Sequence, residues 1–444
     1  MQETVASALA QLARLDTRAA QVAESALGSL AAGQKLEALT QQGVQEFCWY
    51  VLPVRFANHA NERLFAVQSL GRLFSLLDLD RYARICSSET TREILQAYSA
   101  SHDTGLAAYR KAMRASGVEP PDLPEMTWGT VLGNAEIEAY EATSASLELA
   151  IAVGDGDPQA PGWRTVQERH ARSFLTQPDA RGRSRLDLVR EERVHNWLSS
   201  PSHPHRQRLR PLLGQIISGA ETPHDAATAL APARRLLDYA EEGIGLTQIG
   251  YISPTVVREL CVEFDWSSAP SPPRSETDVV QLIALHKLLR TMRAVRHSGR
   301  RMVLTRRGRQ LHGDTNALWR GLAESVLDTD GFAQAATETL LGLLLMRFPK
   351  ATGSHARDED VNIAEEARVV LAESGWTDDG NGSAPDTQHV RSVLITTTWL
   401  LETLGLVVGH DLLEGGGSYQ LTKAGRAFAL LAIHLSATAP AAAI

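Results

Sequence analysis

SETDVVQLIALHKLLRTMRAVRHSGRRMVLTRRGR, residues 275–309, is the stretch that decides the fold. Ser275, followed three residues later by Asp278, resembles a capping box that opens a helix. Apolar residues then recur at helical spacing over residues 279–295. Two short β-like runs follow within residues 294–304, joined by a turn that contains Gly and Ser. The stretch therefore predicts a helix followed by a β-hairpin.

The same stretch is strongly basic. Residues 279–313 contain nine Lys and Arg and no Asp or Glu, in a chain whose formal net charge is −8. Charges this dense repel one another unless an anion or an acidic partner lies nearby, so they indicate contact with nucleic acid. The alternatives are a solvated surface or one that pairs with the acidic N-terminal half of the protein. Eight of the nine are candidate DNA-binding residues: Lys287, Arg290 and Arg293 on the expected helix, Arg296, Arg300 and Arg301 on the expected hairpin, and Arg306 and Arg307 after it.

The segments on either side complete a recognisable order of elements. Residues 226–242 have a helical pattern, and residues 246–252 are β-like. Ser253 and Pro254 then open another helix, with Ser as the cap and Pro in the first turn. Residues 315–327 supply a closing helix. Helix, strand, helix, helix and hairpin follow one another as in a winged helix-turn-helix domain.

The ending of this order occurs twice in the chain. LTRRGR at residues 304–309 reappears as LTKAGR at residues 421–426. Upstream of the second copy, VLITTTWLLETL and GLVV over residues 393–408 match the earlier helix and its exit. A helix, a hairpin and then L-T-[KR]-x-G-R resembles the end of a MarR-type winged helix. The resemblance implies two winged-helix domains in tandem, and the whole chain is similar to bacterial proteins with a helical N-terminal half, from which no function is carried over.

The first 222 residues have little strand-like alternation, and Glu221-Thr222-Pro223 marks a boundary. The expected fold class is therefore mainly α. An all-helical domain over residues 1–222 precedes two winged-helix domains with small β-hairpins. The first, over residues 223–327, has the basic wing, and the second covers residues 328–444. An arginine-rich segment at 164–210 is a candidate extension of the basic surface.

The second copy differs from the first in charge. Asp411 and Glu414 lie at its hairpin, and residues 358–390 contain nine acidic residues against one Arg. A phosphate backbone would repel such a surface, so this domain is expected to contact protein instead. The last helix, over residues 424–435, is apolar on more than one face. That pattern favours a homodimer formed through the C-terminal winged helix.

Residue patterns typical of enzymes and metal sites are not found. The three cysteines lie far apart, which argues against a disulfide framework or a CxxC pair. His195, His203 and His205 cluster, but no carboxylate or cysteine completes a metal site. Phosphate loops, an HExxH motif and a nucleophile elbow are also missing from the sequence. We therefore expect no enzymatic activity, no metal and no cofactor.

Taken together, these patterns predict a cytoplasmic DNA-binding protein. No signal peptide and no apolar run long enough to cross a membrane is visible in the sequence. The first interpretation is a transcriptional regulator or DNA-associated accessory factor that contacts duplex DNA through the first winged helix. The alternative is a protein-interaction scaffold whose winged helices mediate assembly and whose basic patch binds an acidic protein partner.

Overall fold

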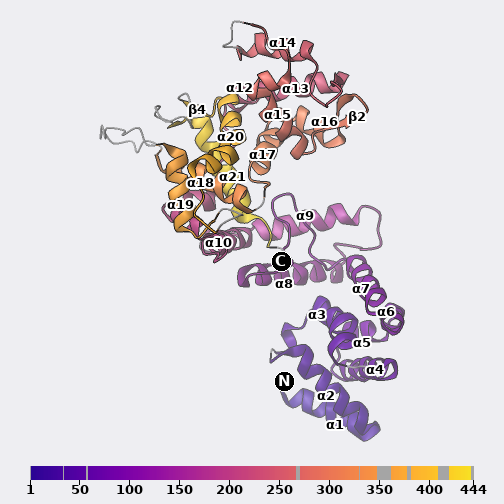
Figure 1. Ribbon diagram of the computed structural model, residues 1–444. Helices are drawn as coiled ribbons and strands as arrows, with labels where there is room; N and C mark the ends of the chain where they lie inside the picture. Colours follow the sequence, from indigo (N-terminus) through magenta and orange to yellow (C-terminus); the bar gives the residue numbers. More distant parts are fainter. Residues whose placement is uncertain are drawn as a thin grey trace. The chain divides into compact units, whose positions relative to one another are not determined.

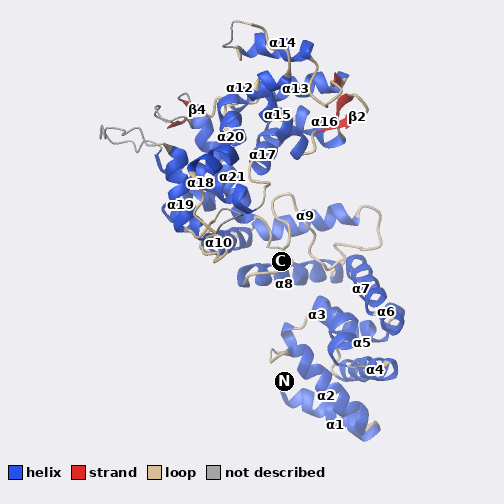
Figure 2. Ribbon diagram, in the orientation of Figure 1, coloured by secondary structure: helices blue, strands red, loops and turns tan. Residues whose placement is uncertain are grey.

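The computed structural model describes residues 2–33, 35–56, 59–266, 271–329, 331–347, 362–377, 382–408 and 420–441. Helices make up most of this part of the chain, and strands form only two small sheets (Figure 2). The predicted mainly α fold class is therefore confirmed. Among these residues, no helix is both long enough and apolar enough to cross a membrane.

The chain divides into two compact units (Figure 1). One unit holds the residues up to Val189 together with Pro440 and Ala441, and the other runs from Arg190 to Ala439. Residues 190–222, expected from the sequence to belong to the N-terminal domain, therefore pack with the C-terminal part.

The first unit is built of helices joined by loops. Asp16, Thr40, Ser88 and Ser101 each cap a helix, because their side-chain oxygens accept a backbone N–H of the first turn. In the described residues before position 223, the only β pairing is a single bridge between Leu123 and Met126. The helices are α1 (Gln2–Leu15), α2 (Thr17–Ala31), η1 (Leu36–Ala38), α3 (Gln41–Glu46), η2 (Phe47–Phe56), α4 (Ala60–Leu76), α5 (Asp80–Ser87), α6 (Glu89–Ala100), α7 (His102–Ser116), α8 (Asn134–Ala152), α9 (Trp163–Thr176) and the start of α10 (Arg185–Leu198).

The second unit begins with the rest of α10 and reaches a small antiparallel sheet. Its first elements are η3 (Pro204–Leu212), α11 (Leu213–Ser218), α12 (Ala226–Ala229), α13 (Ala231–Glu242), β1 (Ile244–Gly245), α14 (Pro254–Phe264), η4 (Glu276–Asp278), α15 (Val280–Thr291), β2 (Val295–Ser298), β3 (Arg301–Leu304), α16 (Arg306–Gly313) and α17 (Thr315–Ser325). The sheet has the order β1-β3-β2, with β2 and β3 joined as a hairpin. In chain order this gives a helix, a strand, two helices and a hairpin, while the name winged helix stays a prediction from the resemblance.

The remainder of the second unit contains the second copy of the repeat. It comprises α18 (Gly331–Arg347), α19 (Ile363–Glu373), α20 (Thr387–Thr403), β4 (Val407–Val408), β5 (Gln420–Leu421) and α21 (Lys423–Thr438). Strands β4 and β5 pair as an antiparallel ladder. Asp411 and Glu414, on which the predicted acidic hairpin depends, lie outside the described residues.

The repeated motif forms the same local structure in both copies. The Thr305 side chain caps α16 by accepting the N–H of Gly308 at 2.9 Å, and Thr422 caps α21 by accepting the N–H of Gly425 at 3.0 Å. Each glycine also lies against the chain that leaves the preceding helix. A Cβ at Gly308 would overlap the carbonyl oxygen of Ala294, and a Cβ at Gly425 would overlap that of Leu406. In both copies the motif therefore starts a helix at a point where the backbone lies against the segment that leaves the preceding helix.

One hydrophobic core runs through both copies. Helix α15 contacts α20, and α17 contacts α21. Trp319 of α17, which is 0% exposed, meets the Phe428 ring of α21 edge-to-face with centroids 5.4 Å apart. The apolar residues on several faces of α21 are buried inside the unit, where α21 also contacts α11 and α18. Internal packing therefore accounts for the pattern that suggested a dimer helix, and self-association stays a prediction without that support.

Candidate nucleic-acid interface

The capping box predicted at Ser275 is present, but it opens η4 rather than α15. The Asp278 carboxylate accepts the backbone N–H of Ser275 at 3.0 Å, and Ser275 Oγ accepts the N–H of Thr277. Helix α15 then begins at Val280 and ends at Thr291. Arg293 was expected on this helix but lies beyond its end, in the left-handed region with φ 54°. That backbone conformation costs a residue with a Cβ roughly 1–2 kcal/mol.

Helix α15 exposes only a narrow face. Its buried residues are Leu282, Ala284, Leu285, His286, Leu288 and Leu289. Lys287, Arg290 and Thr291 are exposed, and Ile283, one turn before Lys287, is half-buried. Any macromolecule that approaches α15 therefore meets two cations beside one aliphatic side chain.

A groove of about 560 Å³ runs along this face. Lys287 and Arg290 line it from α15, His297 from β2, and Ile249 and Tyr251 from the turn after β1. Ile249 is 77% exposed. The groove combines positive charge with apolar surface.

The hairpin places its arginines on a different face. In the β2–β3 ladder, Arg296 is opposite Val303 and Ser298 is opposite Arg301. Because side chains alternate along a strand, Arg296 and Arg301 project from the same side of the sheet, away from the buried Val295 and Met302. Arg300 occupies the two-residue turn with Gly299, whose φ of 58° suits such a turn.

Arg293 and Arg307 lie in another place. Both line a second cleft of about 510 Å³, together with Glu324 and Asp328. Arg307 Nη2 is 3.7 Å from the Glu324 carboxylate. These two arginines therefore face carboxylates that compete with a nucleic acid for them.

All eight predicted residues are exposed, but they do not form one surface. The structure separates a helix groove, an outer hairpin face and an acid-containing cleft. Arg306 stands apart as the first residue of α16. Within the described part of the chain, Arg307 is the one member of the eight with an ion pair, and Arg293 shares its cleft with carboxylates. The other six have neither: Lys287, Arg290, Arg296, Arg300, Arg301 and Arg306.

A row of hydrogen-bonded polar side chains, mostly buried, lies at the base of the groove. Glu276 and His286 are only 3% and 6% exposed. One Glu276 oxygen lies 2.7 Å from His286 Nδ1, and the other accepts the Ile252 N–H at 2.7 Å. His286 Nε2 in turn faces His297 Nε2 at 3.5 Å. This chain of Glu276, His286 and His297 joins η4, the β1 turn, α15 and β2.

Sequence reasoning does not place Glu276, His286 or His297 in the site. The only available signal is that His286 falls within an apolar helical pattern, where a polar residue needs a buried partner. Its partner Glu276 lies ten residues earlier, outside the helix, so spacing alone does not connect the two.

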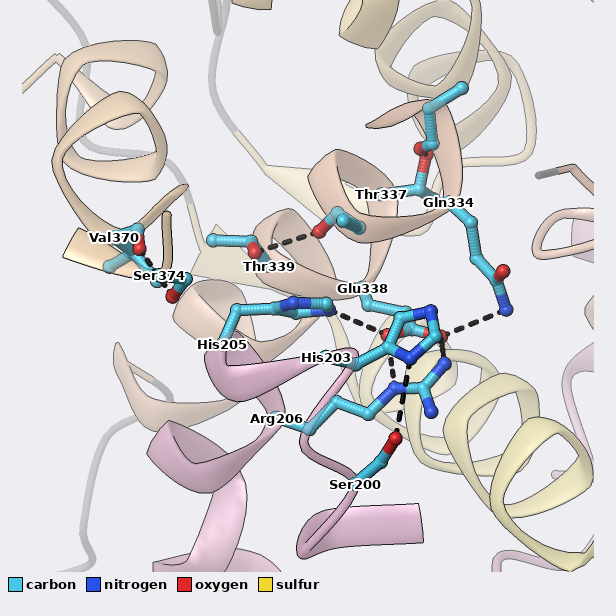
Figure 3. A network of polar contacts seen from close by, with 12 residues as sticks. Ser200, His203, His205, Arg206, Gln334, Thr337, Glu338, Thr339, Val370 and Ser374 are labelled. Carbon is cyan, nitrogen blue, oxygen red and sulfur yellow. Dashed lines mark hydrogen bonds and ion pairs between the residues drawn. The ribbon is translucent and has the colours of Figure 1, made fainter. Parts of the chain in front are cut away.

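Of the three histidines noted in the sequence, His205 belongs to a second buried network (Figure 3), while His203 contacts Ser200 and His195 is exposed. His205 Nε2 lies 2.8 Å from Glu338, and Arg206 donates to both oxygens of Glu338 at 2.8 and 2.9 Å. Gln334 donates to the same carboxylate at 3.1 Å. Burial raises the pKa of Glu338, but the hydrogen bonds from His205 and Arg206 outweigh it and hold the pKa below its ordinary value.

This network is a structural clamp between η3 and α18. The carboxylate that the sequence did not reveal beside the histidines is Glu338, more than a hundred residues away. It is fully engaged by nitrogen donors. Among the described residues, no group of three or more His, Cys, Asp or Glu side chains is arranged to hold a metal ion.

Comparison with known proteins identifies one region. Residues 226–317 match the family of the Y4jL N-terminal domain. The matched segment begins at α12 and ends in α17, so it contains the three-stranded sheet, α15 and all eight predicted residues. It covers less than half of the chain, and the description of the family states no activity. No curated protein and no solved structure matches the chain.

Proposed function

We propose that this protein binds duplex DNA through α15 and the β2–β3 hairpin, as a transcriptional regulator or a DNA-associated accessory factor. The observation that carries the proposal is a set of six exposed cations on α15, on the β2–β3 hairpin and at the start of α16. Among the described residues none of the six has a carboxylate partner. Concentrated positive charge of this kind binds the phosphate backbone with release of counterions. The proposal implies a cytoplasmic location.

We assign α15 and the β2–β3 hairpin to different parts of the DNA. An α-helix fits the major groove, where base edges differ from one pair to the next. Since α15 exposes few polar side chains, Lys287 and Arg290 are the residues that would read bases. Arg296, Arg300 and Arg301 on the hairpin would reach phosphates or the minor groove. This arrangement agrees with the resemblance to a winged helix.

Two of the eight predicted residues receive less support. Arg293 and Arg307 line the cleft that also contains Glu324 and Asp328. We therefore assign the phosphate contacts to the hairpin arginines and to Arg306, and the base contacts to α15.

Neutralising the hairpin tests the proposal. The double variant Arg300→Gln, Arg301→Gln should weaken binding to a labelled random-sequence duplex. Its log–log salt slope should fall by about two units, because two phosphate contacts are lost. Fluorescence anisotropy at two salt concentrations measures both quantities.

The matched control is Arg110→Gln, Arg114→Gln. It removes the same charge from exposed positions on α7. It should change neither affinity nor slope. Equal effects of the two double variants would reject the hairpin as a contact, and no binding by the unmodified protein would reject the function.

A second candidate function is binding of an acidic protein segment. The specific observation is the apolar side of the groove, where Ile249 and Tyr251 adjoin Lys287 and Arg290. An acidic peptide with an apolar anchor would suit that surface. A scaffold would bind polyglutamate and leave duplex DNA unbound, whereas a DNA-binding protein would bind the duplex. Parallel titrations with both polyanions at neutral pH therefore separate the two candidates.

A further inference from the structure

The contacts of Glu276, His286 and His297 constrain which of their side-chain atoms donate and which accept. A carboxylate only accepts hydrogen bonds, so His286 donates its Nδ1–H to Glu276. The Nε2 of a neutral His286 is then an acceptor, and His297 donates its Nε2–H to it. The remaining ring nitrogen of His297, Nδ1, carries a lone pair. Because His297 is exposed, this lone pair can take a proton from solvent.

The charged groups around His297 come from two elements, α15 and η4. Burial, Arg290 and His286 lower the pKa of His297, and Glu276 opposes them. Lys287 of α15 lines the same groove and adds positive charge.

The other neighbours of His297 carry no charge at neutral pH. The turn after β1 contributes Tyr251 to the groove, and its Gly250 lies against the His297 ring. Across the ladder, Met302 faces His297 from β3. With its pKa lowered, His297 is a neutral imidazole at neutral pH, beside the cations Lys287 and Arg290.

An anion reverses this balance. Phosphate groups near Lys287 and Arg290 offset the positive charge that disfavours an imidazolium at His297. The protonated ring still donates Nε2–H to His286, so the polar chain remains intact. Its second N–H becomes available for a charge-assisted hydrogen bond to a phosphate oxygen.

We propose that His297 takes up a proton when duplex DNA binds in this groove, so that affinity for DNA rises as pH falls. The inference rests on the proposed function and specifies how its site is regulated. Binding of the proton and binding of DNA strengthen each other by the same factor, as linkage requires. Each unit by which DNA raises the pKa of His297 gives about a tenfold gain in affinity across the full titration.

The test compares DNA affinity of the full chain at about pH 7.5 and about pH 5.5, on either side of the ordinary histidine range. Ionic strength is held constant and the probe is a labelled random-sequence duplex. The unmodified protein should bind at least about threefold more tightly at the lower pH. His297→Gln keeps a donor toward His286 but cannot take up the proton, so this gain should disappear. His297→Lys is charged at both pH values and should bind tightly at both.

His312→Gln is the matched control. His312 lies in the same part of the chain, but its Nε2 contacts Asp238 at 2.6 Å and it does not line the groove. This variant should keep the pH dependence of the unmodified protein. Thermal unfolding of each variant checks that it is folded, and if His297→Gln does not fold, His297→Lys decides the matter.

The possible outcomes distinguish failure of the proton-uptake inference from failure of the proposed DNA-binding function. Salt-dependent DNA binding whose pH dependence is the same in the unmodified protein and in His297→Gln would overturn the inference and leave the function standing. His297→Lys that binds no more tightly than the unmodified protein at neutral pH would also overturn it. Absence of DNA binding at both pH values would reject both.

Discussion

At the scale of single residues, the repeated Leu-Thr-x-x-Gly-Arg motif marks two places without room for a side chain. Thr305 and Thr422 each cap a helix, and the glycine three residues later rests on a carbonyl group of the preceding segment. Gly308 does not have a left-handed backbone, so conformational freedom does not explain why glycine is needed at this position. Glycine is needed because a Cβ has no room there.

Gly308→Ala should therefore destabilise the second unit strongly. The new Cβ would overlap the Ala294 carbonyl oxygen, which belongs to backbone and cannot rotate away. We expect a loss of about 3 kcal/mol or more in the free energy of unfolding. Gly313→Ala, near the end of the same helix, is the control because a Cβ there meets open space. Urea denaturation of both variants checks this, and a similar midpoint for the two would contradict the steric explanation.

The residue scale also shows where sequence reasoning stops. The repeat is visible in the letters because Thr, Gly and Arg recur at fixed spacing. Arg293 is assigned to the helix from its spacing, yet the helix ends two residues earlier when the backbone turns left-handed. The contact between Glu276 and His286 depends on tertiary packing, which no local pattern encodes.

At the scale of elements, the sequence predicts that a helix is present but does not predict the residues at which it begins and ends. The helix expected over residues 279–295 is α15, Val280–Thr291, preceded by a separate short turn that takes the capping box. The segment expected to be β-like, residues 246–252, forms a single bridge between Leu246 and Ile252, while β1 lies just before it. Strand β1 forms by pairing with β3, which lies far along the chain. The alternation of residues near β1 therefore does not predict where this strand lies.

The buried Glu338 explains why η3 packs with the second unit. The proline at position 223 suggested a boundary, because proline is a strong local marker. A carboxylate shared by His205 and Arg206 instead attaches the preceding segment to α18. Such a clamp joins residues more than a hundred positions apart, beyond the reach of any sequence window.

Glu338→Gln should be costly. It leaves Arg206 as a buried cation without its counter-charge, and breaking a buried pair typically costs about 3–5 kcal/mol. Glu373→Gln is the control, since Glu373 pairs with Arg208 at the surface and should contribute less than about 1 kcal/mol. Guanidinium denaturation of the two variants gives the comparison, and equal small losses would show that the clamp is dispensable.

Because the pKa of Glu338 differs between the folded and unfolded states, we expect the free energy of unfolding to depend on pH. The folded-state pKa of Glu338 is lowered, so its contribution is present above the unfolded pKa and is lost as protons bind on acidification. The free energy of unfolding should therefore fall as the pH drops below about 4.5, the ordinary value for this carboxyl. The slope in this range should be smaller in Glu338→Gln than in the unmodified protein.

At the scale of the whole molecule, the two copies of the repeat share one core. Trp319 is buried against Phe428, and α15 packs on α20. A fragment of residues 223–327 would expose Trp319 and the covered side of α15. We expect this fragment to unfold at a lower urea concentration than a fragment of residues 190–441, and circular dichroism measures both midpoints. Equal midpoints with equal cooperativity would show that the first copy is an independent domain.

The contact between α15 and α20 bears on how the two copies of the repeat depend on each other. These helices occupy equivalent places in the two copies, so the copies meet there through matching elements. Each copy therefore covers a helix face that the other would leave open to solvent if it stood alone.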